Sequence, residues 1–175
     1  MRLLICYAST EGQTRRICRF CAEQVVARGD SVEMLPVGEA GEIDLAPFDA
    51  AILAGSIHVG KLQGGLADFA ATHAGALNRM PTLFLVVSLA IAGGDPGDRA
   101  ELDRIAADFA DKAGWTPGQV AHVAGAFRFT EYNFFEALAM RWIAHRKGQD
   151  VDPHEDTEFT DWAALAEVIR EWPGE

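Results

Sequence analysis

Five short apolar runs recur along this chain, and stretches with helical spacing lie between them. The runs cover about residues 2–8, 31–37, 48–54, 82–89 and 119–126. Strands that alternate with helices form βαβ units, in which a parallel sheet is covered on both faces. The pattern therefore predicts a doubly wound α/β fold around a five-stranded parallel sheet.

The third and fourth runs are nearly continuous in apolar residues, as expected for strands that are buried on both faces. The first helix carries Ile17, Cys21 and Val25 at four-residue spacing and is expected to end at Gly29. Further helices are predicted over about residues 64–77, 99–113 and 161–172. The glycine-rich stretch 38–47 fits either a short helix or a loop.

Length and charge narrow the class of protein. With 175 residues, of which 49% are hydrophobic, the chain is expected to form a single domain over residues 1–175. The formal net charge of −11 and the lack of a basic stripe argue against nucleic acid as a partner. An acidic surface more often serves solubility than binding.

The first apolar run is about six residues long and is too short for a signal peptide or a membrane span. Three cysteines, an odd number, fit a reducing compartment, so we expect a cytoplasmic protein. Cys18 and Cys21 have the spacing of a redox or metal pair, but they lie inside a predicted helix without a second pair. We favour buried small hydrophobes and predict no metal site.

The first strand leads directly into Ser9-Thr10-Glu11-Gly12-Gln13-Thr14. A strand that ends in small hydroxylated residues and a glycine, and then enters a helix, aims backbone N–H groups and hydroxyls at one spot. Neither the lysine of a P-loop nor a G-x-G-x-x-G motif is present. The hexapeptide predicts a cradle for a monophosphate; the competing interpretation is an ordinary turn with Ser9 or Thr14 as the helix N-cap.

Two further turns are expected at the same edge of the sheet, where ligands bind in open α/β folds. Residues 55–61 follow the third strand, and residues 88–94 follow the fourth. Both are bounded by glycine and apolar in the middle, which suits a flat ring system. A receiver domain of the response-regulator type needs acidic residues after the first strand and a lysine after the fifth, and neither is there.

About 33 residues, 127–159, separate the last strand from the last helix, and so long a connection in a compact domain is usually functional. Its stretch 129–143 is aromatic-rich and apolar around most of its circumference. It could pack on the core, form the wall of a large apolar ligand site, or rest on a membrane surface with neighbouring basic residues near headgroups.

Several of these segments together resemble the flavodoxin-like, menaquinone-dependent protoporphyrinogen IX dehydrogenases of bacterial haem biosynthesis. The segments that carry the resemblance are residues 9–14, 55–60, 77–81, 123–129 and 159–162. The first is shared with flavodoxins generally, whereas the exit from the fifth strand, the insertion and the Thr160-Asp161-Trp162 restart are much more specific. The resemblance extends over nearly the whole chain.

The resemblance implies a flavodoxin-like fold, bound FMN, and oxidation of a porphyrinogen in three two-electron rounds with menaquinone or another quinone as acceptor. It leaves peripheral contact with the inner face of the cell membrane, and the oligomeric state, open. The cofactor-binding residues that it implies are Ser9, Thr10, Glu11, Gly12, Gln13, Thr14, Ser56, Ile57, His58, Val59, Gly60, Ser88, Leu89, Ala90, Ile91 and Ala92. The substrate-side candidates are Phe127, Arg128, Phe129, Tyr132, Phe135 and Trp142.

Two of these residues are candidates for a role in the reaction. A guanidinium forks onto a carboxylate, so Arg128 is a candidate for a propionate contact; the alternative is an exposed arginine that only solvates the insertion. His58 could contact the ring or donate a proton, or it could be a surface histidine without a role.

Two departures from the carrier flavodoxins bear on function. Glu11 stands where short carriers have threonine, so its carboxylate must turn away from a phosphate or weaken binding by repulsion. Ala90 and Ile91 stand in place of a stacking tyrosine, which leaves room for substrate. An electron-transfer flavodoxin, another quinone-linked reductase and a non-catalytic binding module remain as alternatives.

Overall fold

The computed structural model describes residues 1–127 and 157–173. Its main sheet has the parallel strand order β2-β1-β3-β5-β6, and β4 pairs antiparallel with β3. The predicted doubly wound fold is thereby confirmed, with β4 as an addition that the sequence did not predict. The strands of this sheet are β1 (Arg2–Ala8), β2 (Ser31–Pro36), β3 (Ala50–His58), β4 (Lys61–Leu62), β5 (Thr82–Ser88) and β6 (Gln119–Ala124).

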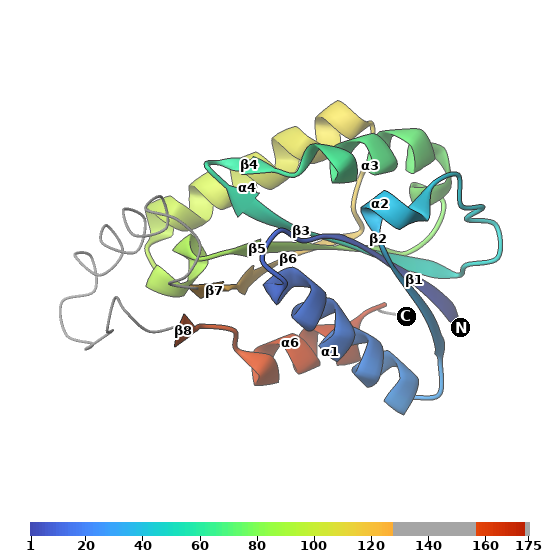
Figure 1. Ribbon diagram of the computed structural model, residues 1–175, viewed down its shortest axis with the longest axis horizontal. Coiled ribbons are helices and arrows are strands. Elements are labelled where there is room, and N and C mark those ends of the chain that lie inside the picture. Colours follow the sequence, from blue (N-terminus) through green and yellow to red (C-terminus); the bar gives the residue numbers. More distant parts are fainter. Residues whose placement is uncertain (128–156, 174–175) are drawn as a thin grey trace.

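Helices cover both faces of the sheet (Figure 1). On one face lie α1 (Gln13–Ala27) and α6 (Trp162–Glu171). On the other lie α2 (Val37–Ala40), α3 (Gly64–Leu77) and α4 (Pro96–Ala113). A 3₁₀ turn, η1 (Ala90–Gly93), follows β5.

Two apolar clusters form the core, one on each side of the sheet, because successive side chains of a strand point to opposite faces. In β1, Leu4 and Cys6 belong to the cluster under α3 and α4. Leu3 and Ile5 belong to the cluster under α1 and α6. All four are fully buried, as expected for a central parallel strand.

The predicted inner face of α1 is confirmed, since Ile17, Cys21 and Val25 are fully buried. Cys18 is buried beside them, and all three thiols of the chain are unpaired. Burial raises the pKa of Cys21 to about 12 and that of Cys18 well above its usual range. These cysteines therefore act as small core residues, because a thiol that stays protonated is a poor nucleophile.

Three element boundaries differ from the predictions. β3 does not stop near residue 54 but continues through His58 and forms a hairpin with β4, so the predicted loop 55–61 is mostly strand. α4 begins at Pro96 instead of 99, since the Asp95 carboxylate accepts hydrogen bonds from the N–H groups of Gly97 and Asp98. β6 ends at Ala124, and the chain then joins a separate antiparallel pair.

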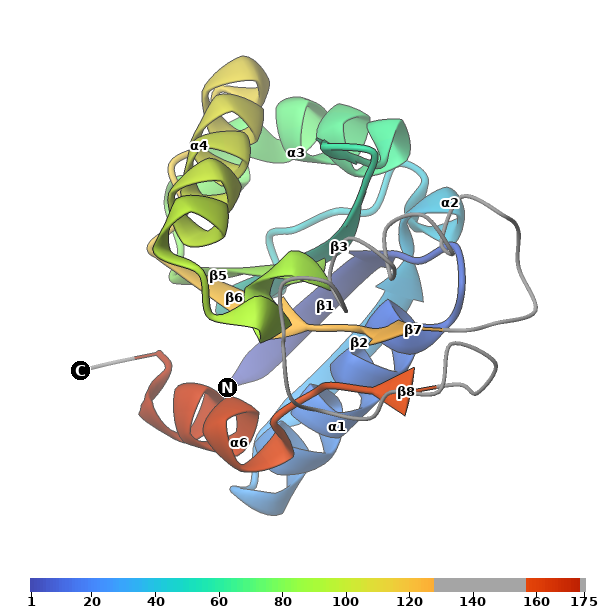
Figure 2. The same ribbon diagram turned by 90° about the vertical axis from the view of Figure 1, so that its left-hand side faces the viewer.

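That pair consists of β7 (Ala126–Phe127) and β8 (Thr157–Glu158), which lie side by side, facing the viewer in Figure 2. Ala126 pairs with Glu158, and Phe127 pairs with Thr157. The N–H of Phe159 also donates to the carbonyl of Gly125, at 3.0 Å. The backbone therefore leaves and re-enters the described fold at one place.

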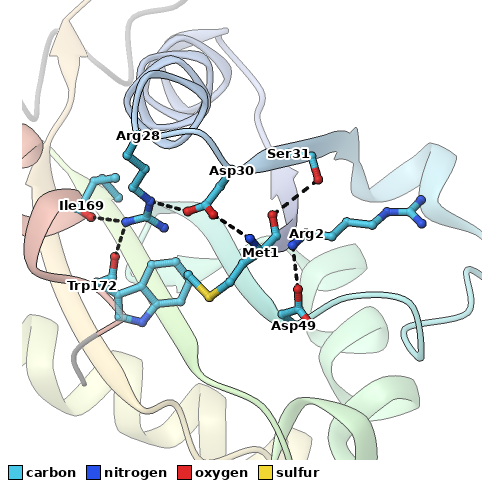
Figure 3. Close-up of polar contacts among 8 residues, drawn as sticks. All are labelled: Met1, Arg2, Arg28, Asp30, Ser31, Asp49, Ile169 and Trp172. Carbon is cyan, nitrogen blue, oxygen red and sulfur yellow. Dashed lines mark hydrogen bonds and ion pairs between the residues drawn. The ribbon is translucent and has the colours of Figure 1, made fainter.

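Charged groups tie the elements together at the amino ends of the parallel strands (Figure 3). Arg28 donates through Nε to Asp30 at 2.6 Å, and through Nη1 to the carbonyl oxygens of Ile169 at 2.9 Å and Trp172 at 2.6 Å. The amino group of Met1 also contacts Asp30, at 2.6 Å. Hydrogen bonds from that amino group and from Arg28 lower the pKa of Asp30.

Across the described residues, none of the helices has both the length and the apolar character needed to cross a membrane. The apolar start of the chain is strand β1, which lies between β2 and β3 in the sheet.

Candidate functional site

A hollow of about 510 Å³, open to solvent, lies at the carboxyl ends of β1, β3 and β5. The residues that line it are Ser9, Glu11, Gln13, Thr14, Ser56, Ile57, His58, Val59, Val87, Ser88, Leu89, Gly125 and Ala126. Four separate chain segments, at the carboxyl ends of β1, β3, β5 and β6, thus meet near the switch point of the sheet.

The first wall is the turn from β1 into α1. Gly12 has φ of 89°, a left-handed conformation that side chains disfavour, and its N–H donates to Ser9 Oγ at 3.0 Å. The N-cap residue of α1 is Gly12, which has no side chain to cap the helix, so neither Ser9 nor Thr14 is its N-cap. Thr14 is buried against the cavity. An uncapped helix start that faces a hollow favours an anionic ligand.

The side chain of Gln13 is already engaged with the protein. Its Nε2 donates to Glu158 Oε1 at 2.8 Å and to Thr160 Oγ1 at 3.0 Å. What Gln13 offers a ligand in the cavity is therefore its backbone N–H. The sequence placed Gln13 in the cradle, but it did not predict that the amide would hold the far end of the insertion.

The second wall is the β3–β4 hairpin. Its two turn residues, Val59 and Gly60, have φ of 50° and 72°, and two positive φ values are typical of a type I′ turn. Valine is strained there, because its branched side chain disfavours a left-handed backbone. Val59 is nonetheless 72% exposed, at the rim of the cavity. Backbone strain of this kind is often found at functional sites.

Gln63 fixes the position of this wall, although the sequence did not point to it. Its Oε1 accepts from the N–H of Ser56 at 3.2 Å, and its Nε2 donates to Ser56 Oγ at 2.8 Å. The same Nε2 lies 3.4 Å from Thr10 Oγ1, in the first wall. Because the N–H of Ser56 needs an acceptor, this orientation of the amide is the consistent one.

His58 lies next to this amide, with Nε2 at 2.9 Å from Ser56 Oγ. Partial burial lowers the pKa of His58 below its ordinary value of 6.5. The imidazole is therefore mainly neutral at pH 7 and can act as a hydrogen-bond donor or acceptor without carrying charge.

The third wall comes from the ends of β5 and β6. Val87, Ser88 and Leu89 line the cavity together with Gly125 and Ala126. The N–H of Gly125 donates to the carbonyl of Ser88 at 3.0 Å, which brings the two strand ends together. A Cβ on Gly125 would lie 3.3 Å from Val87 Cγ1, so glycine allows this close approach.

The structure brings most of the sequence-predicted residues to one place. Thr10 and Gly12 belong to the first turn, and Gly60 to the hairpin, without lining the cavity. Ala90, Ile91 and Ala92 lie in η1 and do not line the cavity. Phe127 is described only as part of β7. The candidates Arg128, Phe129, Tyr132, Phe135 and Trp142 lie outside the described residues.

The cavity combines a polar corner with an apolar remainder. Hydroxyls and the start of α1 form the corner, whereas Ile57, Val59 and Leu89 supply apolar surface. Among its described lining residues there is no lysine or arginine. A phosphomonoester would therefore be held by N–H groups, hydroxyls and the helix dipole, and an attached flat ring by apolar contacts.

An open parallel sheet with this strand order and a phosphate-type corner at the β1/β3 switch point defines a doubly wound α/β protein of the mononucleotide-binding class. A family model described as Flavodoxin domain matches residues 4–154. The chain therefore belongs to the flavodoxin domain family.

Comparison with individual proteins agrees with this assignment. The chain is 27% identical over 171 residues to protoporphyrinogen IX dehydrogenase [quinone] of Escherichia coli K12, which covers 98% of this chain and 94% of that protein. It is 27% identical over 168 residues to the protein of the same name from Leishmania major, and this match covers 94% of this chain and 71% of that protein. A mutant flavodoxin of Fusobacterium nucleatum bound to flavin mononucleotide has a TM-score of 0.52, with 14% identity and coverage of 99% and 94%.

Proposed function

We propose that this protein is an FMN-dependent oxidoreductase that oxidises protoporphyrinogen IX to protoporphyrin IX with a quinone as acceptor. The observation that carries the proposal is the combination of the cradle with the similarity to relatives of that name over 98% of the chain. An alignment of this extent includes the segment between β7 and β8, and not only the sheet and helices of a flavodoxin.

The polar corner would hold the FMN phosphate. The first N–H groups of α1 would donate to its oxygens, together with the hydroxyls of Ser9 and Thr14. The hairpin and the β5 exit would border the ring, with Ser56 to Val59 on one side and Ser88 and Leu89 on the other. Bound FMN would supply the two-electron acceptor for the oxidation.

The chain's own contribution to the reaction is orientation. The apolar atoms of Val59, Val87 and Leu89 would exclude water from the ring, and the β3–β4 hairpin would set the distance of the substrate from it. His58, mainly neutral at pH 7, can accept or donate one proton at a ring nitrogen in the cavity. We extend the proposal to menaquinone as acceptor and to peripheral contact with the inner face of the cell membrane, where a quinone is available.

The decisive experiment is the visible spectrum of the FMN-loaded protein under anaerobic conditions, first with protoporphyrinogen IX and then with a menaquinone analogue. We expect the flavin absorbance to bleach with the porphyrinogen and to recover with the quinone. Bound flavin that stays oxidised after addition of porphyrinogen would refute the substrate assignment. A protein that takes up no FMN would refute the cofactor as well.

One observation favours a second candidate, an electron-transfer flavodoxin. The formal net charge of −11 would suit docking on a basic redox partner by electrostatic steering. The same spectra separate the two candidates, because a carrier would retain FMN but would not be reduced by the porphyrinogen.

A further inference from the structure

The strongest feature that the proposed function leaves unexplained is a cluster of polar contacts behind the cradle. Four residues from three parts of the chain take part: Gln13 and Arg16 in the first turns of α1, Glu158 in β8, and Thr160 just before α6. We refer to these four residues as the clasp. None of its side chains was a sequence candidate except Gln13.

Glu158 is the centre of the clasp. Its Oε1 accepts from Gln13 Nε2 at 2.8 Å, and its Oε2 accepts from Arg16 Nη1 at 3.0 Å. Both carboxylate oxygens are thus directed at the start of α1. The guanidinium of Arg16 also lies 5.4 Å from the ring centroid of Trp162, at the start of α6.

Thr160 extends the clasp to the sheet. Its hydroxyl accepts from Gln13 Nε2 at 3.0 Å and donates to the carbonyl of Ala124, the last residue of β6, at 2.7 Å. The beginning of α1 is thereby tied to the end of β6 as well as to β8. Gly125 and Ala126, which directly follow Ala124 in the chain, belong to the third wall of the cavity.

We propose that Glu158 is a positioning residue for the phosphate cradle: it holds the Gln13 side chain against β8, so that the first N–H groups of α1 face the cavity. The proposal rests on the proposed binding of FMN. Glu158 itself does not line the cavity, and it acts only through Gln13 and Arg16.

If Glu158 acted only through its charge, its removal would change the FMN affinity in the opposite direction. The direction of the change therefore tests the proposal. A carboxylate near a bound phosphate dianion repels it, so an electrostatic role would make removal of Glu158 tighten FMN binding. Arg16 offsets that repulsion by pairing with the same carboxylate. A positioning role makes removal of Glu158 weaken FMN binding, because the N–H groups lose their fixed direction.

The experiment is to measure the Kd of FMN and of riboflavin for the full chain and its Glu158→Ala variant. Riboflavin has the same ring but no phosphate. We expect the Kd of FMN to rise about tenfold, within the usual range for coupled sites, while the Kd of riboflavin stays unchanged. Glu158→Gln keeps an acceptor for Gln13 but loses the Arg16 ion pair. Its FMN affinity should therefore lie between that of the wild-type protein and that of Glu158→Ala.

Glu33→Ala is the matched control. It removes the partner of another arginine, Arg2, at the same N···O distance of 3.0 Å but at the amino end of the sheet. It should leave both affinities unchanged. If Glu158→Ala does not fold, Thr160→Val removes the hydroxyl contacts with little change of shape, and it should weaken FMN binding in the same direction.

An unchanged or tighter Kd of FMN in Glu158→Ala would overturn the proposal, and so would an equal loss of FMN and riboflavin. These outcomes leave the proposed function intact, because the wild-type protein would still bind FMN. If instead the wild-type protein binds no FMN, the proposed function fails first.

Discussion

The two ends of the parallel sheet satisfy their polar groups in different ways. At the amino ends of the strands, Arg28 and Asp30 are paired with each other and with backbone and amino groups from both ends of the described chain (Figure 3). At the carboxyl ends, α1 starts without a side-chain cap, and Val59 has a strained backbone. One end is therefore built for stability and the other for a ligand.

The largest expected effect tests the stabilising end. Arg28→Ala removes the donors to the carbonyl oxygens of Ile169 and Trp172, which then lack this partner at the end of α6. We expect the free energy of unfolding in urea to fall by about 2–3 kcal/mol, with no change in FMN affinity.

Arg104→Ala is the control for Arg28. Arg104 pairs with Glu101 and Asp108 on the exposed face of α4, and pairs of that kind contribute about 0.5 kcal/mol. If Arg104→Ala lost as much free energy of unfolding as Arg28→Ala, the special contribution of the contacts at the amino ends of the strands would be contradicted.

The next effect tests the ligand end. Gly12→Ala places a side chain at φ of 89°, which costs about 1–2 kcal/mol even though nothing lies within 4 Å of the added Cβ. We expect lower stability together with weaker FMN binding. Gly114→Ala, at φ of 66° after α4, is the control: it should destabilise to a similar extent and leave FMN binding unchanged. Equal FMN affinity in both variants would argue against the first turn as the cradle.

Val59→Asn should change the free energy of unfolding in the opposite direction and stabilise the protein. Asparagine accepts a left-handed backbone, so relief of the strain should raise the free energy of unfolding by about 1 kcal/mol. Val26→Asn is the control, because Val26 is 58% exposed but lies in α1, where the change brings no such relief. Urea denaturation of both variants decides the matter. A loss of stability in Val59→Asn would mean that the hairpin depends on the valine side chain.

The smallest expected effect concerns pH. Burial lowers the pKa of His58, so the unfolded chain takes up the proton first when the pH falls below the ordinary value of 6.5. Stability should therefore decline from that pH downward, until the folded-state pKa is reached. His58→Gln should flatten this part of the stability profile. His73 and His122, whose pKa values burial also lowers, should still contribute to the pH dependence in that variant. An unchanged stability profile would contradict a partly buried, mainly neutral His58.

The central strands and α1 could be predicted from sequence because their signals are local. Leu3, Ile5 and Ile52 belong to uninterrupted apolar runs, and all three are fully buried. The start of α4 was predicted three residues too late, although Asp95 before Pro96 is a regular N-cap pattern. The longer β3 was missed because glycine and serine at its end suggest a loop.

The supporting contacts of the site could not be predicted in this way. Gln63 reaches Thr10 across 53 positions, and Gln13 reaches Glu158 across 145. Such contacts depend on the register of the β3–β4 hairpin and on where the chain returns to the sheet, and no local pattern records either. The predicted substrate-side residues stay predictions, and all of them except Phe127 lie outside the described part of the chain.

The pairing of Phe127 with Thr157 has a consequence for how this family can diversify. Because residues 128–156 connect two neighbouring positions of one ladder, a change in their number leaves the end-to-end distance that they must span unaltered. Doubling the length of such a connection costs only about 0.6 kcal/mol in closure entropy. The sheet and the cradle can therefore accept connections of other lengths between β7 and β8.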